Sequence, residues 1–225
     1  MGIINSRCPE RLLQYASHYA PAAQWLYCAT LPEPHDEVAW SNWYLCRILK
    51  RENWTVLASV SQATNLDIGV VCPAFSVVAR EYLDPSTGQP VREALLIVRG
   101  TASMTDWKIN INDNTAQFVY RSGISGSVDV IGYAHEGMLE GARAILKFYG
   151  VRKIIHRLLL EGFNVKTVGH SLGASTALFL AAELNNSLVE IRQDILSLGT
   201  SSRQSKCTKN YFFFFLLMPL AKRVN

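Results

Sequence analysis

Residues 165–184 read VKTVGHSLGASTALFLAAEL, and this stretch decides the fold class. Its first four residues, VKTV, are rich in β-branched side chains and predict a short strand. Residues 172–184 are rich in Ala and Leu and predict a buried helix that follows the strand directly. A strand that runs into a buried helix, in a chain where the two alternate, is typical of a mostly parallel sheet with helices on its faces.

The junction between this strand and this helix carries a candidate nucleophile, Ser171. Gly169 and Gly173 stand two residues before and two residues after it, where the missing Cβ atoms let strand and helix approach closely. The Leu172 backbone N–H, at the helix N-terminus, points at negative charge that develops on an attacked carbonyl. A Gly-x-Ser-x-Gly pattern also occurs as an ordinary tight turn, but the flanking strand and helix favour nucleophilic catalysis at Ser171.

A second strand end supplies a candidate partner for this serine. Residues 75–82 and 93–98 are rich in β-forming side chains, and the sequence DPSTG at 84–88 predicts a turn that joins them in an antiparallel hairpin. The second strand is followed by Thr101, whose backbone N–H and hydroxyl are candidate donors to a tetrahedral oxygen. The alternative for Thr101 is a plain turn at the end of a strand.

In this order the motifs resemble the class 3 (fungal-type) lipase family of the α/β-hydrolase fold, which includes diacylglycerol lipases. The resemblance rests on LLIVRGTASMTDW at 95–107, AHEGM at 134–138 and VGHSLGAS at 168–175. It implies Ser171 as the nucleophile, Thr101 and Leu172 as oxyanion-hole donors, and a lid in the segment after Thr101. It implies structural roles for His135 and His170, the latter within the nucleophile elbow.

The sequence departs from the family's order of serine, then aspartate, then histidine. No histidine follows Ser171, because all five precede it: His18, His35, His135, His156 and His170. The acidic residues after Ser171 are Glu183, Glu190 and Asp194, and Asp194 stands too near the serine for the family's acid loop. The resemblance implies a serine ester hydrolase that acts on acylglycerols or related lipids through an acyl-enzyme. The absent acid and histidine leave an alternative open, a catalytically inactive lipase-like protein that binds lipid or a partner.

Three parts are expected along the chain. Residues 1–66 carry apolar and aromatic side chains at helical spacing and predict an N-terminal helical cap. Residues 67–200 predict a partial α/β-hydrolase domain that stops after the nucleophile helix and one further strand. Residues 201–225 lose the pattern of the fold and are expected to form an atypical basic and aromatic tail. A short apolar run at 212–217 could also be an interfacial anchor, but it falls well short of the roughly 20 residues needed to span a membrane.

Within the domain, three further elements are expected. The segment from Thr101 to about residue 134 is polar and is predicted to be irregular. Apolar residues recur at intervals of three and four over 136–160, which predicts one long helix weakened near Gly150. Residues 195–198, ILSL, predict the further strand.

Charge and cysteine content exclude several classes of function. The net charge is +4, but five Lys and Arg and no acidic residue fall in 201–225, so the remainder carries −1 and offers no track for nucleic acid. The five cysteines are odd in number and lack the spacing of a metal site or a redox pair. The resemblance implies a lipid or ester substrate as the partner, and the acyl-enzyme chemistry needs no metal or other cofactor.

The N-terminal sequence indicates where in the cell the protein is expected. No secretory signal is found, which predicts a cytoplasmic protein with reduced thiols. The first six residues, MGIINS, fit the N-myristoylation pattern at Gly2, and Cys8 could carry a second acyl chain, so attachment to a membrane surface is an alternative.

Overall fold

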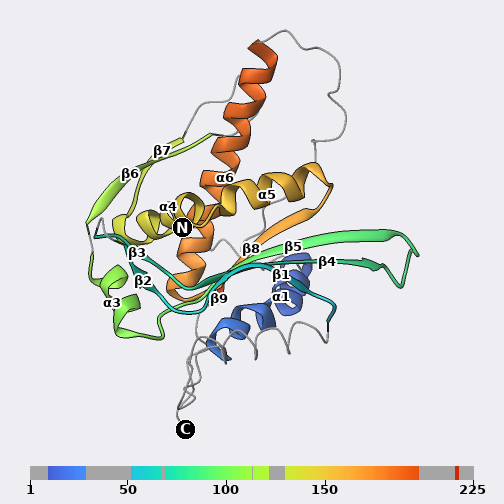
Figure 1. Cartoon of the computed structure of the whole chain (residues 1–225), viewed down its shortest axis with the longest axis horizontal. Helices are drawn as coiled ribbons and strands as arrows, with labels where there is room; N and C mark the ends of the chain where they lie inside the picture. The colour runs from blue at the N-terminus through green and yellow to red at the C-terminus, as the bar shows by residue number, and fades with distance from the viewer. Residues whose placement is uncertain are drawn as a thin grey trace, which may run out of the picture.

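The computed structural model of the chain describes residues 10–28, 52–66, 69–112, 114–121, 130–197 and 216–217. At their centre is a five-stranded sheet with helices on both faces (Figure 1). In order across the sheet, the strands are β1 (Thr55–Val60), β4 (Phe75–Leu83), β5 (Pro90–Val98), β8 (Asn164–His170) and β9 (Leu216–Leu217). This is the α/β architecture that the alternation of strands and helices predicts.

The sheet is mixed but mostly parallel, as predicted, because four of its five strands run in one direction and only β4 runs against them. β1 and β5 run antiparallel to β4, whereas β8 runs parallel to both β5 and β9. A hairpin turn can join only antiparallel neighbours, and the β4–β5 hairpin predicted from the turn at 84–88 is confirmed. The parallel pairing of β5 with β8 needs the long crossover that residues 99–163 provide.

The helices form two layers separated by the sheet (Figure 1). α1 (Glu10–Cys28) covers one face, and α4 (Glu136–Phe148), α5 (Val151–Leu160) and α6 (Leu172–Ser197) cover the other. Side chains of β5 alternate between the two layers, since Leu95 and Ile97 pack with α1 whereas Leu96 and Val98 pack with the other helices. A strand buried on both faces has a continuous apolar sequence, as the LLIV run has.

A buried carboxylate, Glu93 of β5, anchors α1 to the sheet. Lys166 donates to Glu93 Oε1 at 2.6 Å, Arg80 donates to Oε2 at 2.9 Å, and the Tyr19 hydroxyl of α1 donates to Oε1. Burial alone would raise the pKa of Glu93, but Lys166 and the other two partners hold that pKa below its ordinary value. Glu93 is therefore charged, and its bond to Tyr19 ties α1 to three neighbouring strands.

The segment from Thr101 to Ala134 is ordered where the structure describes it, and its prediction as irregular is wrong. It holds α3 (Met104–Ile111) and an antiparallel pair, β6 (Thr115–Tyr120) with β7 (Val130–His135). The pair is fixed to α6 by an edge-to-face contact between Phe118 and Phe179, with ring centroids 5.6 Å apart. A second small pair, β2 (Thr64–Asn65) with β3 (Val71–Cys72), precedes the main hairpin.

Two helical predictions are correct in part. The helix expected within 1–66 is confirmed for α1, but residues 55–60 form strand β1 because they pair with β4, and residues 29–51 lie outside the described part. The single helix expected over 136–160 is two helices, α4 and α5. The break falls at Gly150, whose φ of +66° ends regular helix and suits a residue without a Cβ.

The strand predicted at 195–198 is wrong, because α6 continues through Ser197. Its apolar run is compatible with either a buried strand or a helix, and a helix already under way extends at little cost. The strand that pairs with β8 is instead β9, which lies within the segment expected to be a tail. Only its backbone pairing is described.

Candidate active site

Ser171 occupies a sharp turn between the end of β8 and the start of α6. Its φ is +56°, and its side chain is exposed. Left-handed backbone is uncommon for a residue other than glycine and costs on the order of 1 kcal/mol. The other described non-glycine residue with positive φ is Asn53, a type that tolerates this region. The strain at Ser171 holds the hydroxyl out of the sheet, where a substrate carbonyl can reach it.

Gly169 and Gly173 make this turn sterically feasible. A Cβ on Gly169 would lie 2.2 Å from the carbonyl oxygen of Gly173, and a Cβ on Gly173 would lie 2.3 Å from the carbonyl oxygen of Val98. Both contacts are with backbone, which cannot move aside without separating strand from helix. The sequence prediction of close approach at these two positions is confirmed.

The end of β5 lies against the same turn. Val98 is paired with Gly169, and two residues further on a Cβ at Gly100 would lie 2.4 Å from the carbonyl oxygen of His170. Thr101 follows Gly100 and Leu172 follows Ser171, so the two predicted donor residues belong to backbone segments in direct contact. Their role as an oxyanion hole remains a prediction that this packing supports.

The Thr101 hydroxyl has a hydrogen-bond partner within the site. Asn110 of α3 donates its Nδ2 to Thr101 Oγ1 at 2.9 Å. A hydroxyl oxygen that accepts one bond still has its own proton to donate. Asn110 therefore orients the Thr101 side chain and leaves it able to donate to an oxyanion. The sequence analysis did not identify Asn110, because its link to Thr101 depends on the path of α3.

A buried ion pair supports the loop that carries Thr101. Arg99 is 1% exposed and Asp106 is fully buried, and Arg99 Nη2 donates to Asp106 Oδ2 at 2.9 Å. The same carboxylate oxygen accepts from the backbone N–H groups of Ala102 and Ser103 at 2.9 and 2.8 Å. Arg99 Nη1 donates to the Ser61 carbonyl at 2.9 Å. The loop after β5 is thus closed around one carboxylate.

Sequence reasoning missed Arg99 and Asp106, although one signal was present. Ser103 is the N-cap of α3 and accepts from the Asp106 backbone N–H, while Asp106 binds the Ser103 N–H in return. This reciprocal arrangement is the capping box, which a Ser followed three residues later by an acidic residue can indicate. The pairing with Arg99 could not be seen in the same way.

Replacing Asp106 with Ala should destabilise the protein by about 3 to 5 kcal/mol, because it leaves the Arg99 guanidinium buried without its counter-charge. The free energy of unfolding from urea denaturation measures this loss. The control is Asp84→Ala, which removes a partly exposed aspartate from the β4–β5 turn and should shift the urea midpoint far less. Equal shifts for the two variants would contradict the assigned role of the buried pair.

The described histidines have partners other than Ser171. His170 Nδ1 lies 3.2 Å from the Tyr27 hydroxyl, and His135 is the N-cap of α4, where its side chain accepts from the Met138 N–H. His18 stacks edge-to-face on Tyr19. His35 lies outside the described residues. The structural roles that the resemblance implies for His135 and His170 are compatible with these contacts.

A serine–histidine pair lies between α5 and α6, away from Ser171, and its role is structural. His156 Nε2 lies 3.0 Å from Ser187 Oγ, but that hydroxyl donates its proton to the Leu184 carbonyl at 3.0 Å. Burial, followed by the nearby Arg152, lowers the pKa of His156. Ser187 is buried within a continuous helix, so this pair offers no substrate an approach.

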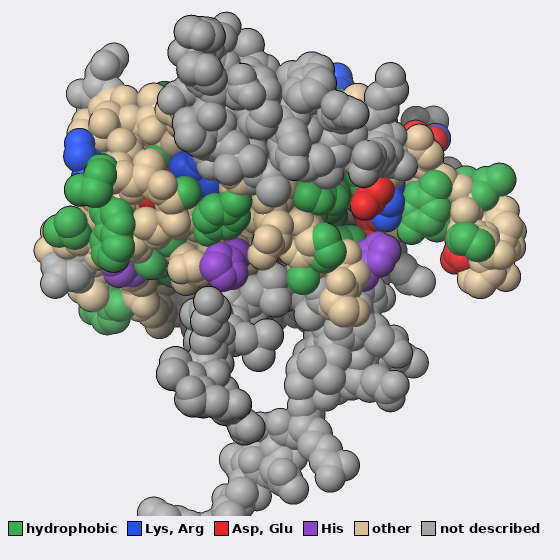
Figure 2. All heavy atoms as spheres, turned by 90° about the horizontal axis from the view of Figure 1, so that it is seen from below, with side chains coloured by type: hydrophobic (Ala, Val, Ile, Leu, Met, Phe, Trp, Pro, Cys, Tyr) green, Lys and Arg blue, Asp and Glu red, His purple; other side chains and the backbone are tan. Residues whose placement is uncertain are grey.

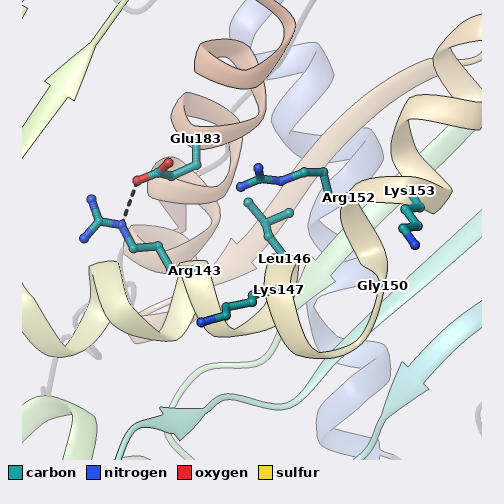
Figure 3. Close-up of a pocket in the computed structure, with 7 residues that line it drawn as sticks. All are labelled: Arg143, Leu146, Lys147, Gly150, Arg152, Lys153 and Glu183. Atoms are coloured by element: carbon teal, nitrogen blue, oxygen red, sulfur yellow. Dashed lines mark hydrogen bonds and ion pairs between the residues drawn. The ribbon is translucent and has the colours of Figure 1, made fainter. Parts of the chain in front are cut away.

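A hollow of about 480 Å³ lies where the α4–α5 turn meets α6 (Figure 3). Its lining is mostly charged, and Arg143 and Glu183 form an ion pair across it with a 2.9 Å bond. Glu183 stands about 18 Å along α6 from Ser171 by the rise of an α-helix. The hollow is therefore remote from Ser171, and its charged lining does not suit the acyl chain of a substrate. Within the described ranges, no group of three His, Cys, Asp or Glu is placed to hold a metal ion.

Comparison with known structures shows the fold. A fungal lipase in complex with an inhibitor, described as a model for interfacial activation, superposes with a TM-score of 0.50 at 16% identity, over 81% of this chain and 58% of that one. A Rhizomucor miehei lipase with its propeptide gives 0.45 at 17% identity, over 79% and 48%. A Yarrowia lipolytica lipase gives 0.45 at 17% identity, over 77% and 55%. The chain spans less than two thirds of each of these lipases.

Comparison with curated proteins finds no match. A family model, in contrast, covers half of the chain and includes both strand ends of the site. The model is that of Lipase (class 3), and it matches residues 95–210. The exposed serine at the strained turn, the glycines on either side of it and the adjoining end of β5 all fall within this match. The chain therefore belongs to the class 3 lipase family, with the α/β-hydrolase fold.

Proposed function

We propose that this chain carries the nucleophile and the oxyanion hole of a serine hydrolase that acts on acylglycerols or related lipid esters. The observation that carries the proposal is Ser171, exposed at a left-handed turn against the backbone segment that bears Thr101. In the reaction, Ser171 Oγ attacks the ester carbonyl carbon while its proton passes to a base. The Thr101 and Leu172 N–H groups stabilise the oxyanion, the alcohol leaves with a proton, and water then hydrolyses the acyl-enzyme.

The proton acceptor for this reaction is not among the described histidines, each of which has another partner. The acid and histidine that the family resemblance implies would follow Ser171, where the printed sequence has no histidine. Full activity therefore requires an acid and a histidine in addition to the residues assigned here. Without them, the protein would bind a lipid or a partner but would not catalyse hydrolysis.

Fatty-acid release separates the hydrolase from the inactive binder. We expect acylglycerol emulsions to release fatty acid with the longest form of the protein that its gene encodes, and not with Ser171→Ala. Co-sedimentation with the emulsion measures binding in parallel. Release without dependence on Ser171 would overturn the proposal, and binding without release would favour the inactive alternative.

An apolar face on α3 supports contact with a lipid surface. Met104, Trp107 and Ile111 are spaced to fall on one side of the helix, and they are 81%, 52% and 72% exposed. Figure 2 shows hydrophobic side chains gathered at the end of the molecule where α3 lies in Figure 1. α3 directly follows the Thr101 loop, which is where the family resemblance places a lid. The opposite side of α3 packs at the nucleophile turn, where Ile109 and Leu172 belong to one apolar cluster.

Attachment through the N-terminus is a separate part of the proposal. In the described ranges, no helix combines the length and the apolar character that a membrane span requires. Gly2 and Cys8, the predicted acylation sites, lie outside these ranges. Two acyl chains bind a membrane stably, whereas one gives only marginal binding.

In a host with N-myristoyltransferase, the protein should gain the mass of one myristoyl group, and Gly2→Ala should abolish the gain. Cys8→Ser should leave the myristoyl mass and shift the protein from the membrane pellet to the supernatant. Intact mass spectrometry and fractionation measure both effects. An unmodified N-terminus in such a host would contradict the prediction of acylation.

A further inference from the structure

The last turn of α1 places the Tyr27 hydroxyl at the junction of β5 and β8, next to the candidate active site. The hydroxyl lies 3.2 Å from His170 Nδ1, and the two rings meet edge-to-face with centroids 5.9 Å apart. His170 is the residue immediately before Ser171. α1 thus reaches the nucleophile turn from the face of the sheet opposite α6.

The same hydroxyl touches the other half of the site. The Gly100 backbone hydrogen-bonds it, and a Cβ on Gly100 would lie 2.2 Å from its oxygen. Gly100 is the residue immediately before Thr101. Tyr27 therefore contacts the residue before each of the two backbone turns that bring Thr101 and Leu172 together.

The chemistry of the phenol suits a fixed link between these two turns. Burial raises the pKa of Tyr27, so its hydroxyl stays protonated through the neutral range. A phenol oxygen can accept from the Gly100 N–H and donate its single proton to His170 Nδ1. The contact at Nδ1 places this edge of the His170 ring toward α1. α1 is itself held by the bond between Tyr19 and buried Glu93.

We propose that Tyr27 is a positioning residue for the oxyanion hole. Its hydroxyl sets the spacing between the Gly100–Thr101 and His170–Ser171 peptides, and so the aim of the Thr101 and Leu172 N–H groups. The inference rests on the proposed function of Ser171 and these two donors. Preorganised donors lose much of their effect when they are displaced by a fraction of an ångström, so one hydroxyl on a remote helix can alter reactivity at Ser171.

The test uses a nucleophile that needs no histidine. The 225-residue chain with Ser171→Cys is treated at pH 9, where much of a thiol with a pKa near 8.5 is ionised. With p-nitrophenyl butyrate the thiolate attacks the carbonyl carbon, an oxyanion forms and collapses, p-nitrophenolate leaves, and a thioester remains. With iodoacetamide the thiolate displaces iodide, and no oxyanion forms. Mass spectrometry of the peptide containing residue 171 gives both rates and separates them from those of the native cysteines.

The ratio of the acylation rate to the alkylation rate reports on the oxyanion hole alone. Adding Tyr27→Phe should lower this ratio about three- to tenfold, the effect of one hydrogen bond, while the alkylation rate stays unchanged. Tyr149→Phe is the matched control, since it removes the hydroxyl of another partly buried tyrosine, which packs against Phe75 on the other side of the sheet and should not change the ratio. An unchanged ratio in Tyr27→Phe, or an equal fall in Tyr149→Phe, would overturn the inference.

The proposed function fails in a different way from the inference. If the ratio for Ser171→Cys equals that of N-acetylcysteine, the turn offers no oxyanion stabilisation, and the proposed function itself is wrong. If the ratio exceeds that of N-acetylcysteine and Tyr27→Phe leaves it unchanged, only the positioning role is wrong.

Discussion

Ser171→Ala should abolish covalent labelling of the protein by a fluorophosphonate probe. The probe phosphonylates a serine only where a base and an oxyanion hole activate the hydroxyl, and in the described part of the chain the exposed, strained turn is at Ser171. The longest form of the protein that its gene encodes is the one to label. Peptide mass spectrometry should place the adduct on Ser171 and find none in the alanine variant.

Ser175→Ala is the matched control for this experiment. Ser175 lies one turn further along α6, is only partly buried, and its backbone N–H bonds to the Ser171 carbonyl. Its replacement should leave labelling intact, because its hydroxyl is within the helix and not at the turn. Labelling that persists in Ser171→Ala would show that the nucleophile is elsewhere.

The 225-residue chain by itself should show no hydrolysis of short p-nitrophenyl esters above its Ser171→Ala variant. Loss of triad function typically lowers turnover by about 10⁴ to 10⁶, and what remains comes from the oxyanion hole and binding. His135, His156 and His170 have structural partners. Initial rates of p-nitrophenol release measure the difference.

Single replacements of the histidines by glutamine provide the control for this prediction. None should change the rate, because none acts as the base. Turnover of ordinary size, about 1 per second or more, would contradict the expectation. If such turnover disappeared in one variant, that histidine would be the base.

The nucleophile turn could be predicted from the sequence because its requirements are local. A strand, a serine between two glycines and an Ala-rich helix are consecutive, and the covalent chain alone places them in contact. The hairpin of β4 and β5 is similar, since the turn at 84–88 joins strands that are neighbours in the chain. In both cases the residues that meet in space are also close in the sequence. The residue types were therefore enough to predict the contact.

Predictions failed where a segment's partner decides its structure. Residues 55–60 are a strand because they pair with β4, and their side chains alone did not show it. Residues 195–197 continue α6, although ILSL is also compatible with a buried strand. Short apolar runs have no periodicity long enough to separate the two outcomes, and the neighbouring element makes the choice.

The sequence by itself determined which residue is the candidate nucleophile and which backbone N–H groups flank it. Only the tertiary structure decided what holds them in place. Arg99 meets Asp106, Asn110 meets Thr101, and Tyr27 reaches across 143 positions to His170. Such contacts depend on the path of the chain through the sheet and its two helical layers. Their distances are set by packing that many residues share, which no pattern along the chain records.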